Sequence, residues 1–111
     1  FEVRAVLSDA PIAIAIIMDN SLADRPYLDA GRALQQMELL AWSKGLGTCF
    51  VSFHEQKDNE RAKVMLEIPS NMELITIMPF GYRLDKVQGV KRNRKNLDEI
   101  SHSNVFGTSF N

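Results

Sequence analysis

The sequence predicts one domain of the α/β or α+β class, in which helices pack on a small sheet. Two apolar segments have the length of strands, a longer segment between them repeats apolar residues at helical spacing, and no linker or repeat interrupts the 111 residues. With 45% hydrophobic and 24% charged residues, the composition is that of a folded chain rather than a disordered one. A chain of this size buries a modest fraction of its surface, so a partner subunit would add stability.

The first predicted strand runs from Ile12 to Met18. Isoleucines occupy every second position from Ile12 to Ile16, and alanines lie between them. Because neither set is charged, we expect the strand to be buried on both faces, with a helix close to the alanine face. A second strand is predicted from Glu73 to Met78, closed by Pro79-Phe80-Gly81.

Two helices are predicted between these strands. The longer one runs from Tyr27 to Lys44, with Pro26 in the first turn and Gly45 as a C-terminal stop. A short extended segment, Thr48 to Phe53, follows it, and a second helix is expected from about Asn59 to Leu66. This alternation of strands and helices is the basis of the predicted fold class.

After the last strand the chain becomes basic and irregular. Five cations lie between Lys86 and Lys95 and precede a short helical stretch, Leu97 to His102. The tail, residues 103–111, has no helical pattern but contains three large apolar side chains: Val105, Phe106 and Phe110. Such a tail is expected to dock, either on another subunit or back onto its own sheet.

Six short motifs occur in an order that resembles the C-terminal half of the nitroreductase family. No single motif is specific, but the ordered set is, and the resemblance extends from about Ala10 to His102. It implies an α+β domain, incomplete at its N-terminal side, that binds FMN, forms a homodimer and passes hydride from NADH or NADPH to nitroaromatic, quinone-like or similar acceptors. The motifs are Ala10-Pro11, Asp29-Ala30-Gly31-Arg32-Ala33, Gly45-Leu46-Gly47-Thr48-Cys49-Phe50, Ile68-Pro69, Pro79-Phe80-Gly81-Tyr82 and Arg92-Asn93-Arg94.

The predicted phosphate site is the pair Arg92 and Arg94. Two residues apart on an extended loop, their guanidinium groups can lie on one side and donate paired hydrogen bonds to a phosphate. The resemblance assigns the FMN phosphate to this pair. Taken from the residues alone, a solvated basic surface is the alternative.

The predicted flavin-ring contact is Phe50, Val51 and Ser52. A flexible glycine turn precedes this segment, so its backbone amides could approach a flat ligand and bond the reactive edge of a flavin. The resemblance places the isoalloxazine here, although many members carry glycine or an acidic residue near Ser52 and Phe53. The residues alone equally fit a helix end followed by a buried strand.

Other reactive residues receive no chemical role. Cys49 is expected to be a small buried residue, and its lack of a disulfide partner fits the cytoplasm. His54 and His102 have no metal-ligand spacing, and no catalytic acid, base or nucleophile is assigned because the flavin supplies the chemistry. Gly31 costs about 1 kcal/mol relative to alanine inside a helix, a cost that makes sense if another backbone comes close.

Two rival functions remain beside the flavoenzyme. The resemblance attributes a further flavin-binding segment to the family's N-terminal region, and residues 1–7 are too short to be that segment. The start at Phe1 suggests an excerpt or a processed product. The chain could therefore be an inactive half-domain that serves as a binding or dimerisation module. A nucleic-acid-binding role is disfavoured by the net charge of -1, and the longest apolar run is too short for a membrane span.

Overall fold

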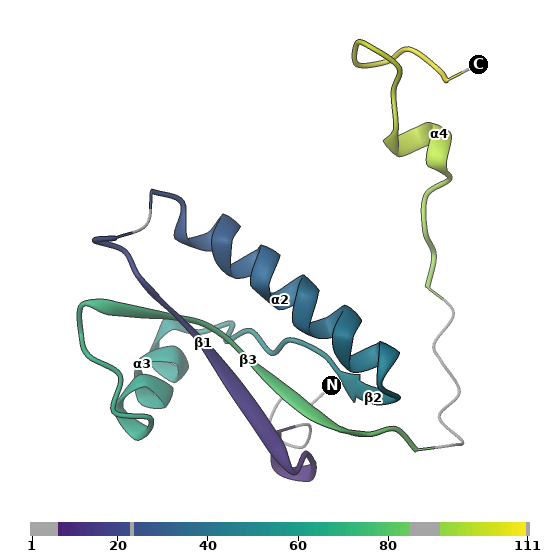
Figure 1. Ribbon diagram of the computed structural model, residues 1–111. Helices are drawn as coiled ribbons and strands as arrows, with labels where there is room; N and C mark the ends of the chain where they lie inside the picture. The colour runs from purple at the N-terminus through teal and green to yellow at the C-terminus, as the bar shows by residue number, and fades with distance from the viewer. Residues whose placement is uncertain (1–6, 23, 85–91, 111) are drawn as a thin grey trace.

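The computed structural model describes residues 7–22, 24–84 and 92–110. Its centre is a three-stranded antiparallel sheet in the order β1-β3-β2, in which β1 is Ile12–Asp19, β2 is Leu46–Thr48 and β3 is Met72–Tyr82. Figure 1 shows β3 as the central strand. The helix–sheet arrangement confirms the predicted α+β class.

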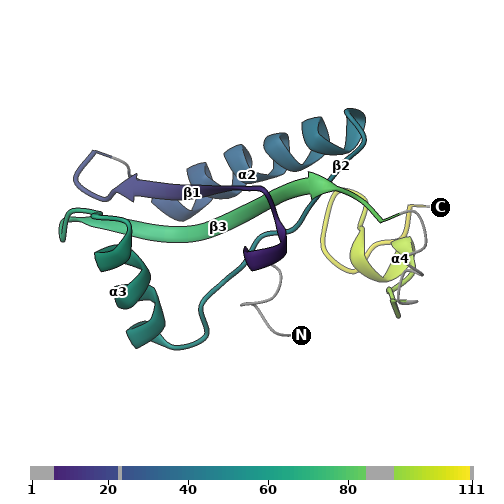
Figure 2. The same cartoon turned by 90° about the horizontal axis from the view of Figure 1, so that it is seen from below.

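Two helices lie on opposite sides of this sheet, as Figure 2 shows. Helix α2 spans Pro26–Ser43, so Pro26 lies in the first turn as predicted, and Gly45 follows its end with a positive φ of 78°. Helix α3 spans Gln56–Met65 and is tied to the sheet by a hydrogen bond of 2.9 Å from Asn59 Nδ2 to the Leu74 carbonyl.

The core lies between α2 and the sheet. Ile16, Ala30 and Met78 are buried in contact with one another, and Met78 has no exposed surface. Further half-buried side chains complete this layer: Met18, Leu34, Met37, Ile75 and Phe80. Small Ala30 and Ala41 on the inner face of α2 allow the helix to lie close to the strands.

Strand β1 differs from its predicted environment in two ways. Its isoleucine face, not its alanine face, meets α2, because Ile16 packs against Ala30 while Ile14 shares a groove with Met37. The strand is also less buried than expected, since Ile12 is 61% and Ile14 43% exposed. The lower burial follows from its place at the edge of the sheet, with β3 on one side only.

Strand β3 is longer than predicted and continues through Pro79 to Tyr82. Proline is rare in a central strand because it lacks the N–H that a ladder needs. The Pro79 carbonyl accepts a 2.7 Å hydrogen bond from Thr48 Oγ1, so its backbone faces the side of β2, at the residue where β2 ends. No ladder hydrogen bond is lost there, and β3 can continue.

The end of the chain leaves the sheet, as Figure 1 shows. Helix α4, Leu97–Ile100, begins with a capping box in which Asn96 and Glu99 satisfy each other's backbone N–H groups. Beyond it the rings of Phe106 and His102 lie 4.4 Å apart between centroids and are tilted by 51°. Phe106 remains 91% exposed, and Phe110 is 69% exposed. The radius of gyration is 17.4 Å, against about 13 Å for a compact domain of this length.

In residues 7–22, 24–84 and 92–110, no helix has the length and apolar character needed to cross a bilayer.

Candidate functional site

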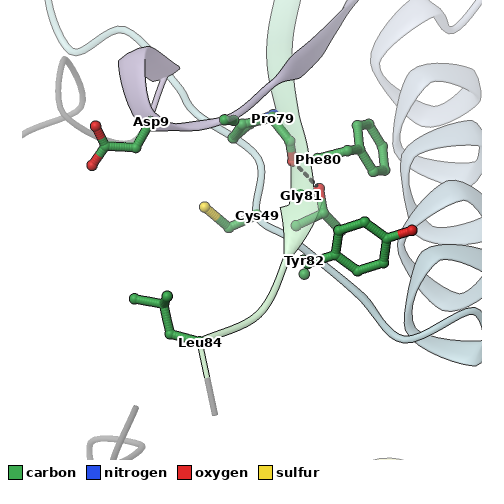
Figure 3. A pocket seen from close by; sticks show the side chains of 10 residues that line it. Asp9, Cys49, Pro79, Phe80, Gly81, Tyr82 and Leu84 are labelled. Carbon is green, nitrogen blue, oxygen red and sulfur yellow. Dashed lines mark hydrogen bonds between the residues drawn. The ribbon is translucent and has the colours of Figure 1, made fainter. Parts of the chain in front are cut away.

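A hollow of about 440 Å³ lies where β2 and β3 end, and Figure 3 shows it from close by. It is mainly apolar and is closed on one side by the helical turn at residues 7–9, which precedes β1. Its lining residues are Asp9, Ala10, Gly47, Thr48, Cys49, Pro79, Phe80, Gly81, Tyr82 and Leu84. Hollows of this size and polarity are typical of small-molecule sites.

Two glycines allow the segments around this hollow to lie close together. A Cβ on Gly81 would lie 3.1 Å from Pro11 Cδ, and a Cβ on Gly47 would lie 2.7 Å from Arg83 Cγ. The second distance is shorter than any real contact, so Gly47 is required for the observed position of Arg83. The glycine motif was predicted as a flexible turn, and the structure gives it a packing role as well.

Cys49 points into the hollow, between Asp9 and Leu84 (Figure 3). Its thiol is free and the residue is half-buried, less than the burial expected for a core residue. Phe80 and Tyr82 turn the other way, toward α2. The wall on the Cys49 side is therefore formed by the chain between β2 and Val51.

That chain is held by Val51, the middle residue of the predicted flavin contact. Val51 is 3% exposed, its N–H donates to the Ile77 carbonyl at 2.9 Å, and its carbonyl accepts from the Ile77 N–H at 3.3 Å and the Thr76 hydroxyl at 2.7 Å. Both backbone groups of Val51 are thus engaged with β3. They hold the segment on the sheet and are not available to a ligand.

The flanking residues Phe50 and Ser52 have the opposite orientation. Along an extended chain, successive backbone groups point to opposite sides, so their N–H groups point away from β3. Within the described residues neither N–H donates a hydrogen bond. Phe50 is 57% exposed and Ser52 is exposed. This arrangement fits a flat ligand with acceptor atoms at its edge.

Arg92 and Arg94 lie in irregular backbone before α4 and are exposed. Among the described residues neither forms an ion pair with a carboxylate. Guanidinium groups without a carboxylate partner among the described residues fit a role in binding an external anion. Neither arginine is among the residues that line the hollow.

Sequence reasoning did not identify Arg83, the residue that follows β3. Its guanidinium carbon lies 4.5 Å from the centre of the Trp42 ring, a cation–π contact with the last turn of α2. No motif signals this contact, because the two residues are forty-one positions apart and meet only through the fold.

A polar cluster lies at the opposite end of the sheet. The Tyr27 hydroxyl donates to Glu73 Oε1, and Asn20 Nδ2 donates to Glu73 Oε2 at 2.9 Å. These hydrogen bonds, that from Tyr27 first, lower the pKa of Glu73, and the same bond raises the pKa of Tyr27. The cluster is exposed and joins the start of α2 to the start of β3, so its role is structural.

Within the described ranges no three His, Cys, Asp or Glu side chains form a group that could hold a metal ion. His54 is exposed, and His102 contacts Phe106 in the tail.

The fold and the hollow define an α+β domain with a mainly apolar hollow at one end of its sheet. A model of the nitroreductase family matches residues 3–82, well over half of the chain, and the chain belongs to this family. The resemblance drawn from the motifs is thereby confirmed.

Individual relatives agree with this assignment. A protein of Methanothermobacter thermautotrophicus, provisionally named NADH dehydrogenase/NAD(P)H nitroreductase, is 32% identical over 82 residues, which are 70% of this chain and 43% of that protein. The structure of an FMN-dependent nitroreductase from Clostridium difficile R20291 matches with a TM-score of 0.73 and 26% identity, over 87% of this chain and 59% of that chain.

A third similarity concerns the fold alone. An oxidised iodotyrosine deiodinase, solved with FMN and 3-iodo-L-tyrosine, matches with a TM-score of 0.69 and 23% identity, over 83% of this chain and 48% of that chain. The chain thus spans less than half of the archaeal relative and about three fifths of the clostridial one. The clostridial relative is named as FMN-dependent, and the nitroreductase family is one of flavin oxidoreductases.

Proposed function

We propose that this chain is part of an FMN-dependent oxidoreductase that passes hydride from NADH or NADPH through the flavin to nitroaromatic or quinone-like acceptors. The observation that carries the proposal is the family match over residues 3–82, together with outward-facing amides at the segment where the motif places the flavin. The free thiol of Cys49 agrees with work in a reducing compartment such as the cytoplasm.

The residues present fit part of an FMN molecule. The Phe50 and Ser52 amides would donate to the edge of the ring, and Val51 would hold them in place through its bonds to β3. Arg92 and Arg94 would neutralise the phosphate. When bound, FMN supplies the hydride acceptor and donor, so the protein needs to bind, orient and shield it rather than to provide an acid or a base.

Titration with FMN tests the phosphate assignment. Replacing Arg92 and Arg94 together by alanine should weaken FMN binding by more than about fivefold, because a phosphate in a pocket is partly desolvated and its ion pairs exceed the roughly 1 kcal/mol of exposed ones. A matched control, Lys57→Ala with Arg61→Ala, removes the same charge from exposed ion pairs on α3 and should leave binding unchanged. Equal FMN affinity in both double variants would refute the assignment.

We further propose a homodimer in which residues 103–111 reach the other subunit. The tail lies apart from the sheet in Figure 1, with Val105 66% and Phe106 91% exposed. Burying such side chains gains roughly 1.5–3 kcal/mol each. Deleting the residues after His102 should therefore weaken the dimer in sedimentation experiments. A monomeric intact chain, or an equally tight dimer after the deletion, would exclude the cross-subunit tail.

A half-domain without redox turnover is the second candidate, favoured by one observation: the chain spans 43% of its archaeal relative. Flavin absorbance separates the two. Purified protein, or protein mixed with FMN and passed through a desalting column, should retain the flavin bands if the chain binds the cofactor. A colourless protein that also fails to bind FMN in titration would favour the module over the enzyme.

A further inference from the structure

The two outward amides of the candidate flavin segment differ in how firmly the chain holds them. A trans peptide unit is planar, so the carbonyl of one residue and the N–H of the next point in opposite directions and turn together. The direction of the Phe50 N–H is therefore set by the Cys49 carbonyl. That of the Ser52 N–H is set in the same way by the Val51 carbonyl.

The Val51 carbonyl is held at two points. It accepts the Ile77 N–H at 3.3 Å and the buried Thr76 hydroxyl at 2.7 Å. The peptide between Val51 and Ser52 cannot turn unless both of these hydrogen bonds break. The Ser52 N–H is thus a donor of fixed direction.

The register of the strands shows which residue would hold the Cys49 carbonyl. Strand β2 ends at Thr48, and pairing with β3 resumes in the same register where Val51 meets Ile77. Val51 and Ile77 exchange both N–H···O bonds, and in an antiparallel ladder such pairs recur at every second residue. The next of them toward β2 is Cys49 with Pro79.

Pro79 cannot complete this pair, because proline has no N–H to donate. Its carbonyl accepts instead from Thr48 Oγ1 at 2.7 Å, the dashed line in Figure 3. Within the described residues, neither the N–H nor the carbonyl of Cys49 forms a hydrogen bond. The peptide between Cys49 and Phe50 is therefore not fastened to β3, although the segment is fastened on both sides of it.

We propose that Pro79 is a positioning residue that leaves the peptide between Cys49 and Phe50 free to turn against a bound flavin. The inference rests on the proposed function, in which the ring edge meets this segment. Hydride transfer from NADH or NADPH places a hydrogen on a ring nitrogen and the electron pair in the ring, so an acceptor of the oxidised ring becomes a donor in the reduced one. A peptide that turns offers the Phe50 N–H to the first and the Cys49 carbonyl to the second.

The two amides have different roles in this arrangement. The fixed Ser52 N–H orients the ring, and the peptide between Cys49 and Phe50 follows its redox state. Met78 and Phe80, on either side of the proline, remain paired with β1. The proline therefore releases one peptide of the segment without detaching β3 from the sheet.

Hydrogen exchange of Pro79→Ala tests the missing N–H without any flavin. The new N–H at position 79 should donate to the Cys49 carbonyl and exchange as slowly as the Ile77 N–H, which makes the equivalent bond to Val51. If it exchanges as fast as an exposed amide while the amides of α2 stay protected, the proline is not what releases Cys49, and the proposal is overturned.

Infrared spectroscopy of the unaltered chain tests the turning peptide itself. Cys49 is the sole cysteine, so cysteine labelled with ¹³C at its carbonyl marks this one peptide. The labelled band should move to lower frequency when bound FMN is reduced, because the Cys49 carbonyl then accepts a hydrogen bond. A labelled band that is the same in the oxidised and reduced complexes would overturn the proposal, whatever the fate of the variant.

Pro79→Ala should also weaken the binding of reduced FMN relative to oxidised FMN about two- to twelvefold, the value of one net hydrogen bond. The closed ladder would hold the Phe50 N–H outward, where it suits the oxidised ring alone, so the midpoint potential of the bound flavin should fall. Pro69→Ala is the matched control, because it adds the same N–H in the turn that precedes β3. Its midpoint potential should equal that of the wild type.

The outcomes separate this inference from the proposed function. Wild-type protein that binds FMN with a labelled band indifferent to reduction, or equal potentials in both proline variants, would overturn the turning peptide while leaving flavin binding. A wild-type chain that does not bind FMN would refute the proposed function and the role of this peptide together. The exchange rate at position 79 would then still report on the ladder alone.

Discussion

The hydroxyl of Thr76 connects the core to the candidate flavin segment, and Thr76→Val should weaken that connection. Thr76 is 2% exposed and donates to the Val51 carbonyl at 2.7 Å. Valine keeps the shape but not the hydrogen bond, whose net contribution is about 0.5–1.5 kcal/mol. The larger penalty for an unsatisfied buried acceptor should not arise, because the Val51 carbonyl still accepts from the Ile77 N–H at 3.3 Å.

The expected loss is therefore about 1 kcal/mol of unfolding free energy, or roughly 3–6 °C in Tm for a domain of this size. Urea unfolding should show a lower midpoint with an unchanged slope, since the surface exposed on unfolding is the same. Hydrogen exchange of the Val51 N–H should accelerate more than that of amides in α2, because the perturbation is local.

The control is Thr76→Ser, which retains the hydroxyl and loses a methyl group. The serine variant should lower the urea midpoint, because the missing methyl group leaves a small cavity. The protection of the Val51 N–H from hydrogen exchange, relative to the global stability, should be preserved. Equal protection of this amide in the valine and serine variants would show that the Thr76 hydroxyl does not hold the segment.

Two further predictions follow from the contacts at the two ends of the sheet. Gly47→Ala should displace Arg83 from Trp42, because the new Cβ would lie 2.7 Å from Arg83 Cγ. Trp42 is the sole tryptophan, so the fluorescence spectrum of the folded protein should change. An unchanged spectrum would argue against the contact between Arg83 and Trp42. Tyr27→Phe should raise the pKa of Glu73 toward its ordinary value. A lowered carboxyl pKa contributes stability that is present above the unfolded-state pKa of about 4.3 and is lost as pH falls through the folded-state pKa. The variant should therefore lose less stability on acidification than the wild type. An identical pH dependence of stability in the two proteins would count against this hydrogen bond.

The order of the elements could be predicted from the sequence because each has a local signal. Alternating isoleucines marked β1, helical spacing with Pro26 and Gly45 marked α2, and both boundaries agree with the structure to within one residue. The end of β3 was wrong, since a proline usually closes a central strand. The structure shows that β2 ends next to Pro79, so the ladder between β2 and β3 requires no N–H from this residue.

The sequence indicates a candidate flavin segment but not the orientation of its residues, and none of the three lines the hollow. The motif identified Phe50, Val51 and Ser52 as one group, and the sequence does not indicate which of them faces a ligand. The structure divides them, because Val51 pairs with Ile77 and so its neighbours point away from the sheet. Which residue of such a segment faces the sheet depends on its register with β3, and register is a property of the partner strand as much as of the segment itself.

The places where the sequence predicted more burial than the chain provides have a common feature. Ile12 and Ile14 lie on the edge strand β1, and the tail with Val105, Phe106 and Phe110 lies apart from the sheet, so neither set is fully covered by the described residues. Burial patterns in a sequence reflect every surface that a side chain meets in the assembled protein, whether within the chain or beyond it. A chain that spans 43% of its archaeal relative is expected to expose such surfaces. The mismatch between predicted and observed burial therefore identifies the surfaces on which binding partners should be sought.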